Sequence, residues 1–119
     1  MDIKILEDEF SVLQYEKMPE NIPEIHFTAV TEDEVSVLCK SHLKPQNAKN
    51  CEDGFRGMQI LGNLDFSLIG ILSRITTILA DNEIPVFVVS TFNTDYIFVK
   101  NEYLPLATQL LLASGYNII

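Results

Sequence analysis

The order of hydrophobic periodicities in the second half of the chain constrains its fold more than any other feature. Apolar residues recur at helical spacing in two segments, and four further segments are short apolar runs typical of strands. In chain order the sequence predicts a strand at 58–61, a helix at 67–82, strands at 85–90 and 94–99, a helix at 104–114 and a strand at 116–119. This is the order of the ferredoxin-like βαββαβ unit. We therefore expect an α+β fold in which two helices pack on one face of an antiparallel sheet.

The boundaries of these segments carry their own signals. Ser67 or Asp65 is a suitable N-cap for the first helix, and Asn82 is a suitable stop. Pro105 suits the first turn of the second helix, and Gly115 can end that helix with a positive φ. The run 85–90 is almost continuously apolar, which predicts a strand in the middle of the sheet.

The first half of the chain has no long helical period and predicts strands and loops. Two strand pairs, each around an acidic turn, are predicted here: 3–5 with 10–15, and 26–31 with 35–39. Residues 40–57 contain Pro45, Gly54 and Gly57 and predict an exposed loop. The pattern suggests a degenerate copy of the same unit. We expect a strand-rich half at 1–57 followed by a complete βαββαβ half at 58–119.

The charge balance excludes two classes of partner. The chain carries 8 Lys and Arg against 17 Asp and Glu, a formal net charge of -9. Such a surface repels the phosphates of nucleic acids and the anionic lipids of membranes. No stretch approaches the roughly 20 apolar residues that span a bilayer. The acidic start at 1–9 is unlike a signal peptide, and Cys39 and Cys51 fit no metal or redox spacing, so we expect a cytoplasmic protein with two reduced thiols.

Three stretches of the second half carry specific motifs: LDFSLIGIL at 64–72, ADNEIPVF at 80–87 and STFNTDYIFV at 90–99. On these motifs the chain resembles the ACT family, in particular the amino-acid-binding ACT proteins of bacteria. It is also similar to the CASTOR family of cytosolic arginine sensors. The resemblance extends to residues 3–7 and 27–34 and thus covers nearly the whole chain.

The resemblance implies tandem ACT-like halves with a ligand groove where ACT modules meet. It assigns nine residues to that groove: Phe66, Ser67, Leu68, Ile69, Gly70, Pro85, Val86, Thr94 and Asp95. The arginine sensors have a glutamate two residues before the glycine, where this chain has Leu68. Because guanidinium recognition rests on bidentate carboxylate pairing, this departure disfavours arginine as the ligand.

Two of these residues have alternative interpretations from the residues themselves. Asp95, between two apolar strands, needs a hydrogen-bonding or cationic partner, which a ligand ammonium could provide. It could equally bond the backbone of the turn at 92–94. Gly70 interrupts the helical stripe at a cost of ~1 kcal/mol relative to Ala. It could admit a ligand to the first helical turn, or it could serve only helix-on-sheet packing.

The sequence offers no combination of nucleophile, base and orienting group, so we expect no catalytic residue, metal or cofactor. We expect a regulatory module that binds a small molecule, an amino acid or an analogue. The alternative is a protein-interaction or oligomerisation domain of the same fold that binds no ligand. Two ACT-like halves in one chain also predict a homodimer, in which the four-module arrangement is rebuilt by two-fold symmetry.

Overall fold

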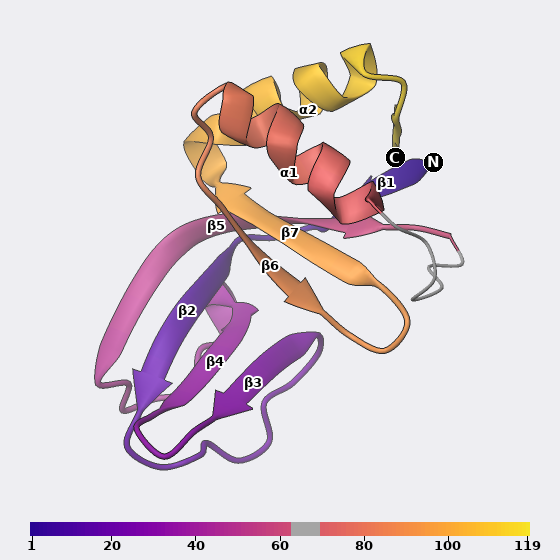
Figure 1. Cartoon of the computed structure of the whole chain (residues 1–119). Helices are drawn as coiled ribbons and strands as arrows, with labels where there is room; N and C mark the ends of the chain where they lie inside the picture. The colour runs from indigo at the N-terminus through magenta and orange to yellow at the C-terminus, as the bar shows by residue number, and fades with distance from the viewer. Residues whose placement is uncertain (63–69) are drawn as a thin grey trace. The chain divides into compact units, whose positions relative to one another are not determined.

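The structure is a computed structural model, and it describes residues 1–62 and 70–119 (Figure 1). These residues form two compact units. Residues 1–7 and 56–119 make up the first, here called the helical unit, and residues 8–55 make up the second, here called the strand unit.

The elements follow one another along the chain as eight strands, two α-helices and two short 3₁₀ helices within the described residues. Their bounds are β1 Asp2–Ile5, β2 Phe10–Tyr15, β3 His26–Val30, β4 Val35–Lys40, η1 Ser41–Leu43, β5 Asn50–Ile60, α1 Ile71–Asp81, β6 Val86–Ser90, β7 Asp95–Lys100, η2 Asn101–Tyr103, α2 Leu104–Ala113 and β8 Asn117–Ile118.

The sheet of the helical unit has the strand order β6-β7-β5-β1-β8. β6 pairs with β7 and β1 with β5 in antiparallel fashion, whereas β8 runs parallel to β1. The α+β prediction is confirmed, but the sheet is mixed rather than purely antiparallel. The N-terminal strand causes this difference, because β1 lies between β5 and β8. β6 pairs with β7 alone among the described strands, so its predicted place in the middle of the sheet is wrong.

Both predicted helices form, and they cover one face of this sheet (Figure 1). Each helix buries two residues one turn apart, Ile75 with Leu79 in α1 and Ala107 with Leu111 in α2. These residues share a core with Ile97 and other strand residues. As predicted, α1 is followed by Asn82 as its C-cap, and Gly115 after α2 has a φ of 99°.

The start of α1 differs from the prediction. In the described residues the helix begins at Ile71, and Gly70 is its N-cap, with a φ of 84° in the left-handed region. Gly70 therefore precedes the helix rather than interrupting it. The two candidate caps, Ser67 and Asp65, lie outside the described residues.

The sheet of the strand unit has the order β5-β2-β4-β3, in which all neighbours are antiparallel. Residues 8–55, all of them described, contain no α-helix. The predicted pairing of 26–31 with 35–39 is confirmed. The predicted hairpin of 3–5 with 10–15 is wrong, because β1 pairs with β5 and β8 while β2 pairs with β4 and β5.

The predicted loop at 40–57 is wrong in its second part, because β5 already begins at Asn50. The register between β2 and β5 shifts by one residue between Phe10 and Val12, which marks a β-bulge. Gly54, opposite this shift, has a φ of 90°. Such a bulge needs a residue that tolerates positive φ, so this glycine belongs to a strand and not to a loop.

One hairpin layout occurs twice in the chain. β3 and β6 have five residues, β4 and β7 have six, and a three-residue 3₁₀ helix follows each pair. The turns correspond as well. The amide of Thr31 donates to the carbonyl of Glu34 at 2.9 Å, and that of Thr91 donates to the carbonyl of Thr94 at 2.8 Å.

Within the described residues, neither helix has the length and apolar character needed to cross a lipid bilayer.

Candidate functional site

The residues that the sequence assigns to a ligand groove fall into separate places in the helical unit. Pro85 and Val86 lie at the start of β6, whereas Thr94 and Asp95 lie at the start of β7. Val86 pairs with Val99, and Ser90 pairs with Asp95. Pro85 and Val86 therefore lie at one end of the hairpin, and Thr94 and Asp95 lie at the other. Four residue steps along a strand separate them by roughly 13 Å. The other assigned residues are Gly70, directly before α1, and Phe66, Ser67, Leu68 and Ile69, which lie outside the described residues.

Asp95 lies on the side of the sheet that faces the helices. Side chains alternate along a strand, and Ile97 and Val99 on the same strand belong to the core under the helices. Asp95 is half-buried and forms a cross-strand pair with Ser90, whose Oγ donates a hydrogen bond to its Oδ1. The carboxylate is thus held in place by a neutral hydroxyl and meets no cation among the described residues.

The turn before Asp95 is closed by another side chain. The Oγ1 of Thr91 accepts from the amide of Thr94 at 3.3 Å and donates to the carbonyl of Thr94 at 3.1 Å. The hydroxyl of Thr94 in turn donates to the carbonyl of Ile60, the last residue of β5. In the described residues the backbone of this turn is bonded by the threonine hydroxyls and not by Asp95, whose carboxylate joins the two strands at the turn through Ser90.

Gly70 is required by backbone conformation rather than by crowding. A Cβ at this position would meet nothing within 4 Å among the described residues, which leaves helix-on-sheet packing without support. Its φ of 84° is one that residues with a side chain rarely adopt. No side-chain hydrogen bond caps the start of α1 there, so the amides of its first turn have no side-chain acceptor in the described residues.

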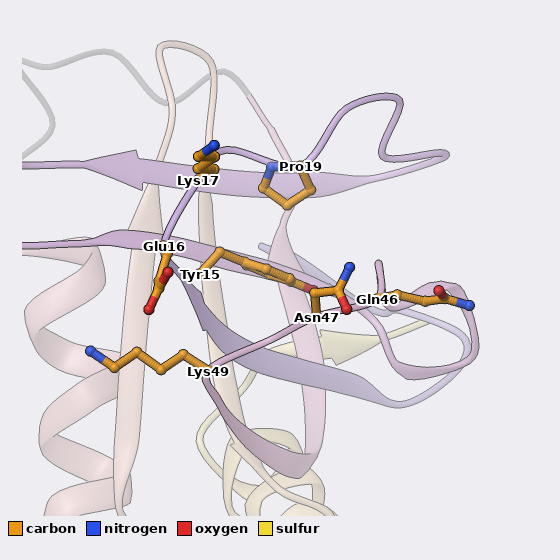
Figure 2. A pocket seen from close by; sticks show the side chains of 7 residues that line it. All are labelled: Tyr15, Glu16, Lys17, Pro19, Gln46, Asn47 and Lys49. Carbon is orange, nitrogen blue, oxygen red and sulfur yellow. The ribbon is translucent and has the colours of Figure 1, made fainter.

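A pocket of about 420 Å³ in the strand unit was missed by sequence reasoning (Figure 2). It lies between the segment after β2 and the segment before β5, and it is lined by Tyr15, Glu16, Lys17, Pro19, Gln46, Asn47 and Lys49. Only 5% of Tyr15 is exposed, and its hydroxyl donates to the carbonyl of Pro45 at 2.6 Å. No periodicity marks these loop residues, so the sequence carried no signal for the pocket.

A polar cluster stabilises the same unit around the carboxylate of Asp53. Its Oδ1 accepts hydrogen bonds from the buried hydroxyl of Ser11, from the Sγ of Cys51 at 3.3 Å and from the Nζ of Lys44 at 3.1 Å. These hydrogen bonds together lower the pKa of Asp53 to about 2, and the bond from Ser11 makes the largest contribution, followed by those from Cys51 and Lys44. Ser11 is fully buried, so no ligand can reach its hydroxyl, and the cluster is structural.

The thiols of the strand unit are free, with Cys39 buried and Cys51 exposed. Burial raises the pKa of the Cys39 thiol, and partial desolvation together with the neighbouring carboxylate of Asp53 raises that of Cys51. At neutral pH they are therefore protonated and poorly nucleophilic. In the part of the chain that the structure describes, no three His, Cys, Asp or Glu side chains come together as metal ligands.

Solved structures similar to this chain come from several bacteria. A protein from Agobacterium tumefaciens matches with 26% identity and a TM-score of 0.89, over 99% of this chain and 91% of that one. The regulatory subunit of aspartate kinase from Thermus thermophilus, in a ligand-free form, matches with 9% identity and a TM-score of 0.70, over 97% of both chains. An aspartate kinase from Clostridium acetobutylicum matches with 12% identity and a TM-score of 0.71, over 94% of this chain but 34% of the enzyme. The last two likenesses show the fold alone.

No curated protein matches the sequence. The model of the ACT domain family matches residues 50–113, more than half of the chain. This match spans both helices and strands β5 to β7, and it includes the start of α1 and the Ser90–Asp95 pair. The chain belongs to the ACT domain family.

Proposed function

We propose that this protein is a regulatory module that binds a free α-amino acid, or a close analogue, where ACT modules meet, and that it has no catalytic activity of its own. ACT domains are regulatory, amino-acid-binding modules, and two similar structures are an aspartate kinase and a regulatory subunit of that enzyme. A cytoplasmic location is part of the proposal.

The observation that carries the proposal is the placement of Asp95. Its carboxylate is half-buried, faces the helix side of the sheet and is paired only with the hydroxyl of Ser90 in the described residues. A ligand ammonium would supply the missing cation. The amides at the start of α1, which have no side-chain acceptor among the residues that the structure describes, would suit the ligand carboxylate.

The remaining assigned residues suit a site shared by two modules. Pro85 and Val86 lie at the opposite end of the hairpin from Asp95. We therefore propose that a ligand bound at Asp95 of one module contacts Pro85 and Val86 of another. We propose that Phe66, Ser67, Leu68 and Ile69 line the groove beside Gly70. This arrangement makes a homodimer part of the proposal.

We further propose that the chain holds tandem ACT-like halves, with the strand-rich first half at 1–57 degenerate and the ACT domain proper at 58–119. The repeated hairpin layout and the strand order β5-β2-β4-β3 support a common origin of the halves. The first hairpin has Val35 at the position of Asp95 and Val30 at that of Ser90. At this position only the second hairpin offers a carboxylate for an ammonium.

The proposed ligand has a neutral or aliphatic side chain. Leu68 and Ile69 are apolar, and Leu68 stands where the arginine sensors have a glutamate. Without that carboxylate we expect arginine to bind less tightly than the best amino acid. Calorimetric titration of the twenty amino acids measures this order, and arginine binding tightest would contradict the assignment of Leu68.

The test of the proposed function is a thermal-shift panel of the twenty amino acids on the parent protein and on Asp95→Asn. Ligand at a hundredfold excess over its dissociation constant stabilises a protein by ~2.7 kcal/mol. For a domain of this size that is a shift of several degrees in Tm. Asp95→Asn keeps the shape and the hydrogen bond from Ser90 but removes the charge, so without ligand it should melt near the unliganded parent. At the same ligand concentration its shift should be about half that of the parent or smaller, because a tenfold weaker affinity leaves ~1.4 kcal/mol of stabilisation.

Asp33→Asn is the matched control, because Asp33 lies in the corresponding turn of the other hairpin and is exposed. This variant should respond to ligand like the parent. A full shift in Asp95→Asn would place the site elsewhere. A panel with no response in the parent would favour the alternative, an ACT domain that mediates protein interaction or oligomerisation without a ligand.

A further inference from the structure

The pocket of the strand unit is lined by three charged side chains, Glu16, Lys17 and Lys49. All three are exposed, and none forms an ion pair or a side-chain hydrogen bond with the residues that the structure describes. Other lysines of the same unit are paired, since Lys40 contacts Asp8 and Glu24, and Lys44 contacts Asp53. The carboxylate of Glu16 and the ammonium groups of Lys17 and Lys49 therefore remain available to a ligand.

The arrangement of these side chains separates a charged end from a neutral end (Figure 2). The ring of Tyr15 lies across the pocket, with Lys17 and Pro19 on one side and Asn47 and Lys49 on the other. In this view Glu16 and Lys49 are seen toward one end of the ring and Asn47 toward its hydroxyl end. The hydrogen bond from that hydroxyl to the carbonyl of Pro45 holds the ring of Tyr15 in place in the wall of the pocket.

The pocket exists because the strand unit has loops where the helical unit has helices. Between β5 and β6 the helical unit has α1, and between β7 and β8 it has α2, and both fill one face of its sheet. The segments after β2 and after β4 in the strand unit contain no α-helix among their residues, all of which are described. The volume of about 420 Å³ between them falls in the range of small-molecule sites.

We propose that this pocket is a second ligand site of the chain and that it binds an α-amino acid as a zwitterion. Glu16 accepts hydrogen bonds from the ammonium, and Lys49, with Lys17 across the pocket, pairs with the carboxylate. The ligand side chain lies along the ring of Tyr15 toward the amides of Asn47 and Gln46. The inference rests on the proposed function for the class of ligand only, because no residue is shared with the groove at Asp95.

The test is a titration of ¹⁵N-labelled protein with each of the twenty amino acids, followed residue by residue in amide spectra. The amides of Lys17, Gln46, Asn47 and Lys49 should shift in a saturable way with at least one amino acid. Loss of a partner for a charged group lowers the affinity about tenfold or more. Lys49→Gln and Glu16→Gln should therefore each raise the dissociation constant obtained from these shifts at least tenfold. The N-acetyl and amide derivatives of the same amino acid, which each lack one charge, should be weakened alike.

Lys4→Gln, on β1 of the helical unit, is the control and should leave the titration unchanged. All three substituted side chains are exposed, so the variants should keep the parent's amide spectrum away from the change. Shifts at 46–49 that persist in Asp95→Asn support a separate site, even where the shifts at 94–95 and the proposed function fail. Shifts at 94–95 with none at 46–49 for any amino acid would overturn the inference alone. It would also be overturned if both Lys49→Gln and Glu16→Gln bound like the parent.

Discussion

Asp53 concentrates three hydrogen bonds on a single carboxylate oxygen. The donors are a hydroxyl, a thiol and an ammonium, and they come from β2, from β5 itself and from the segment after η1. These bonds favour the charged carboxylate and hold its pKa at about 2 instead of the ordinary 3.8. The cluster joins three segments that no α-helix covers, and it therefore makes the stability of the strand unit depend on one charge.

This dependence predicts a specific acid response. Because the folded pKa lies below the unfolded one, the stabilisation by Asp53 is fully present above about pH 4 and is lost as the pH falls toward about 2. Asp53→Asn should be less stable than the parent at neutral pH and should lose less stability over that window. Urea unfolding at several pH values measures the difference, with Glu32→Gln in an exposed turn as the control. Parallel pH profiles for parent and Asp53→Asn would contradict the prediction.

Asp95 marks the limit of what single residues reveal. The sequence identified it as a carboxylate among apolar strands, and the structure adds Ser90 as its partner and gives the hydrogen bonds of the turn backbone to Thr91. The pocket around Tyr15 could not be anticipated in the same way. Apart from Tyr15 at the end of β2, its residues lie on two loops that are distant in sequence, and such loops carry no periodic signal.

At the scale of elements, β5 and β7 approach each other closely at Gly57. A Cβ at this position would lie 2.8 Å from Cε1 of Phe98 and 3.0 Å from Cδ1 of Leu6. The ring of Phe98 cannot easily yield, because it is fully buried and stacked on Phe87 with 5.1 Å between ring centroids. The absence of a side chain at this point of β5 is thus a packing requirement.

We expect Gly57→Ala to destabilise the protein by ~1–3 kcal/mol, the usual cost of overpacking a core. Urea unfolding measures it as a lower midpoint with an unchanged slope. In a double-mutant cycle, Phe98→Leu should absorb part of this cost, because it removes the ring atom in the way. Strict additivity of the two substitutions would show that Phe98 is not the obstacle.

Helices were easier to predict than strand partners. The stripe from Ile75 to Leu79 and the segment at 104–113 depend on local spacing, which the sequence shows directly. Strand pairing is non-local, so adjacency in sequence wrongly joined residues 3–5 to residues 10–15. Gly54 contributed to the wrong loop prediction at 40–57 for another reason. In a sequence, a glycine within a β-bulge cannot be told apart from a glycine that ends a strand.

At the scale of the whole molecule, the strand edges bear on assembly. Among the described strands, β6 pairs only with β7 and β3 only with β4. Edge strands offer unpaired backbone groups, which proteins cover or pair. We predict a homodimer, and sedimentation equilibrium should give twice the mass of the single chain at tens of micromolar. A monomer with and without the best amino acid would contradict it.

The position of β1 also sets the order in which the chain can fold during translation. Ile3 pairs with Ile60 on one side and with Ile118 on the other, so β1 can pair only after much later parts of the sequence have been made. Contacts of such long sequence separation slow folding, since loop closure must precede them. Residues 8–55 are continuous and can begin to pair while synthesis goes on. The helical unit can complete its sheet only after residue 118 has left the ribosome.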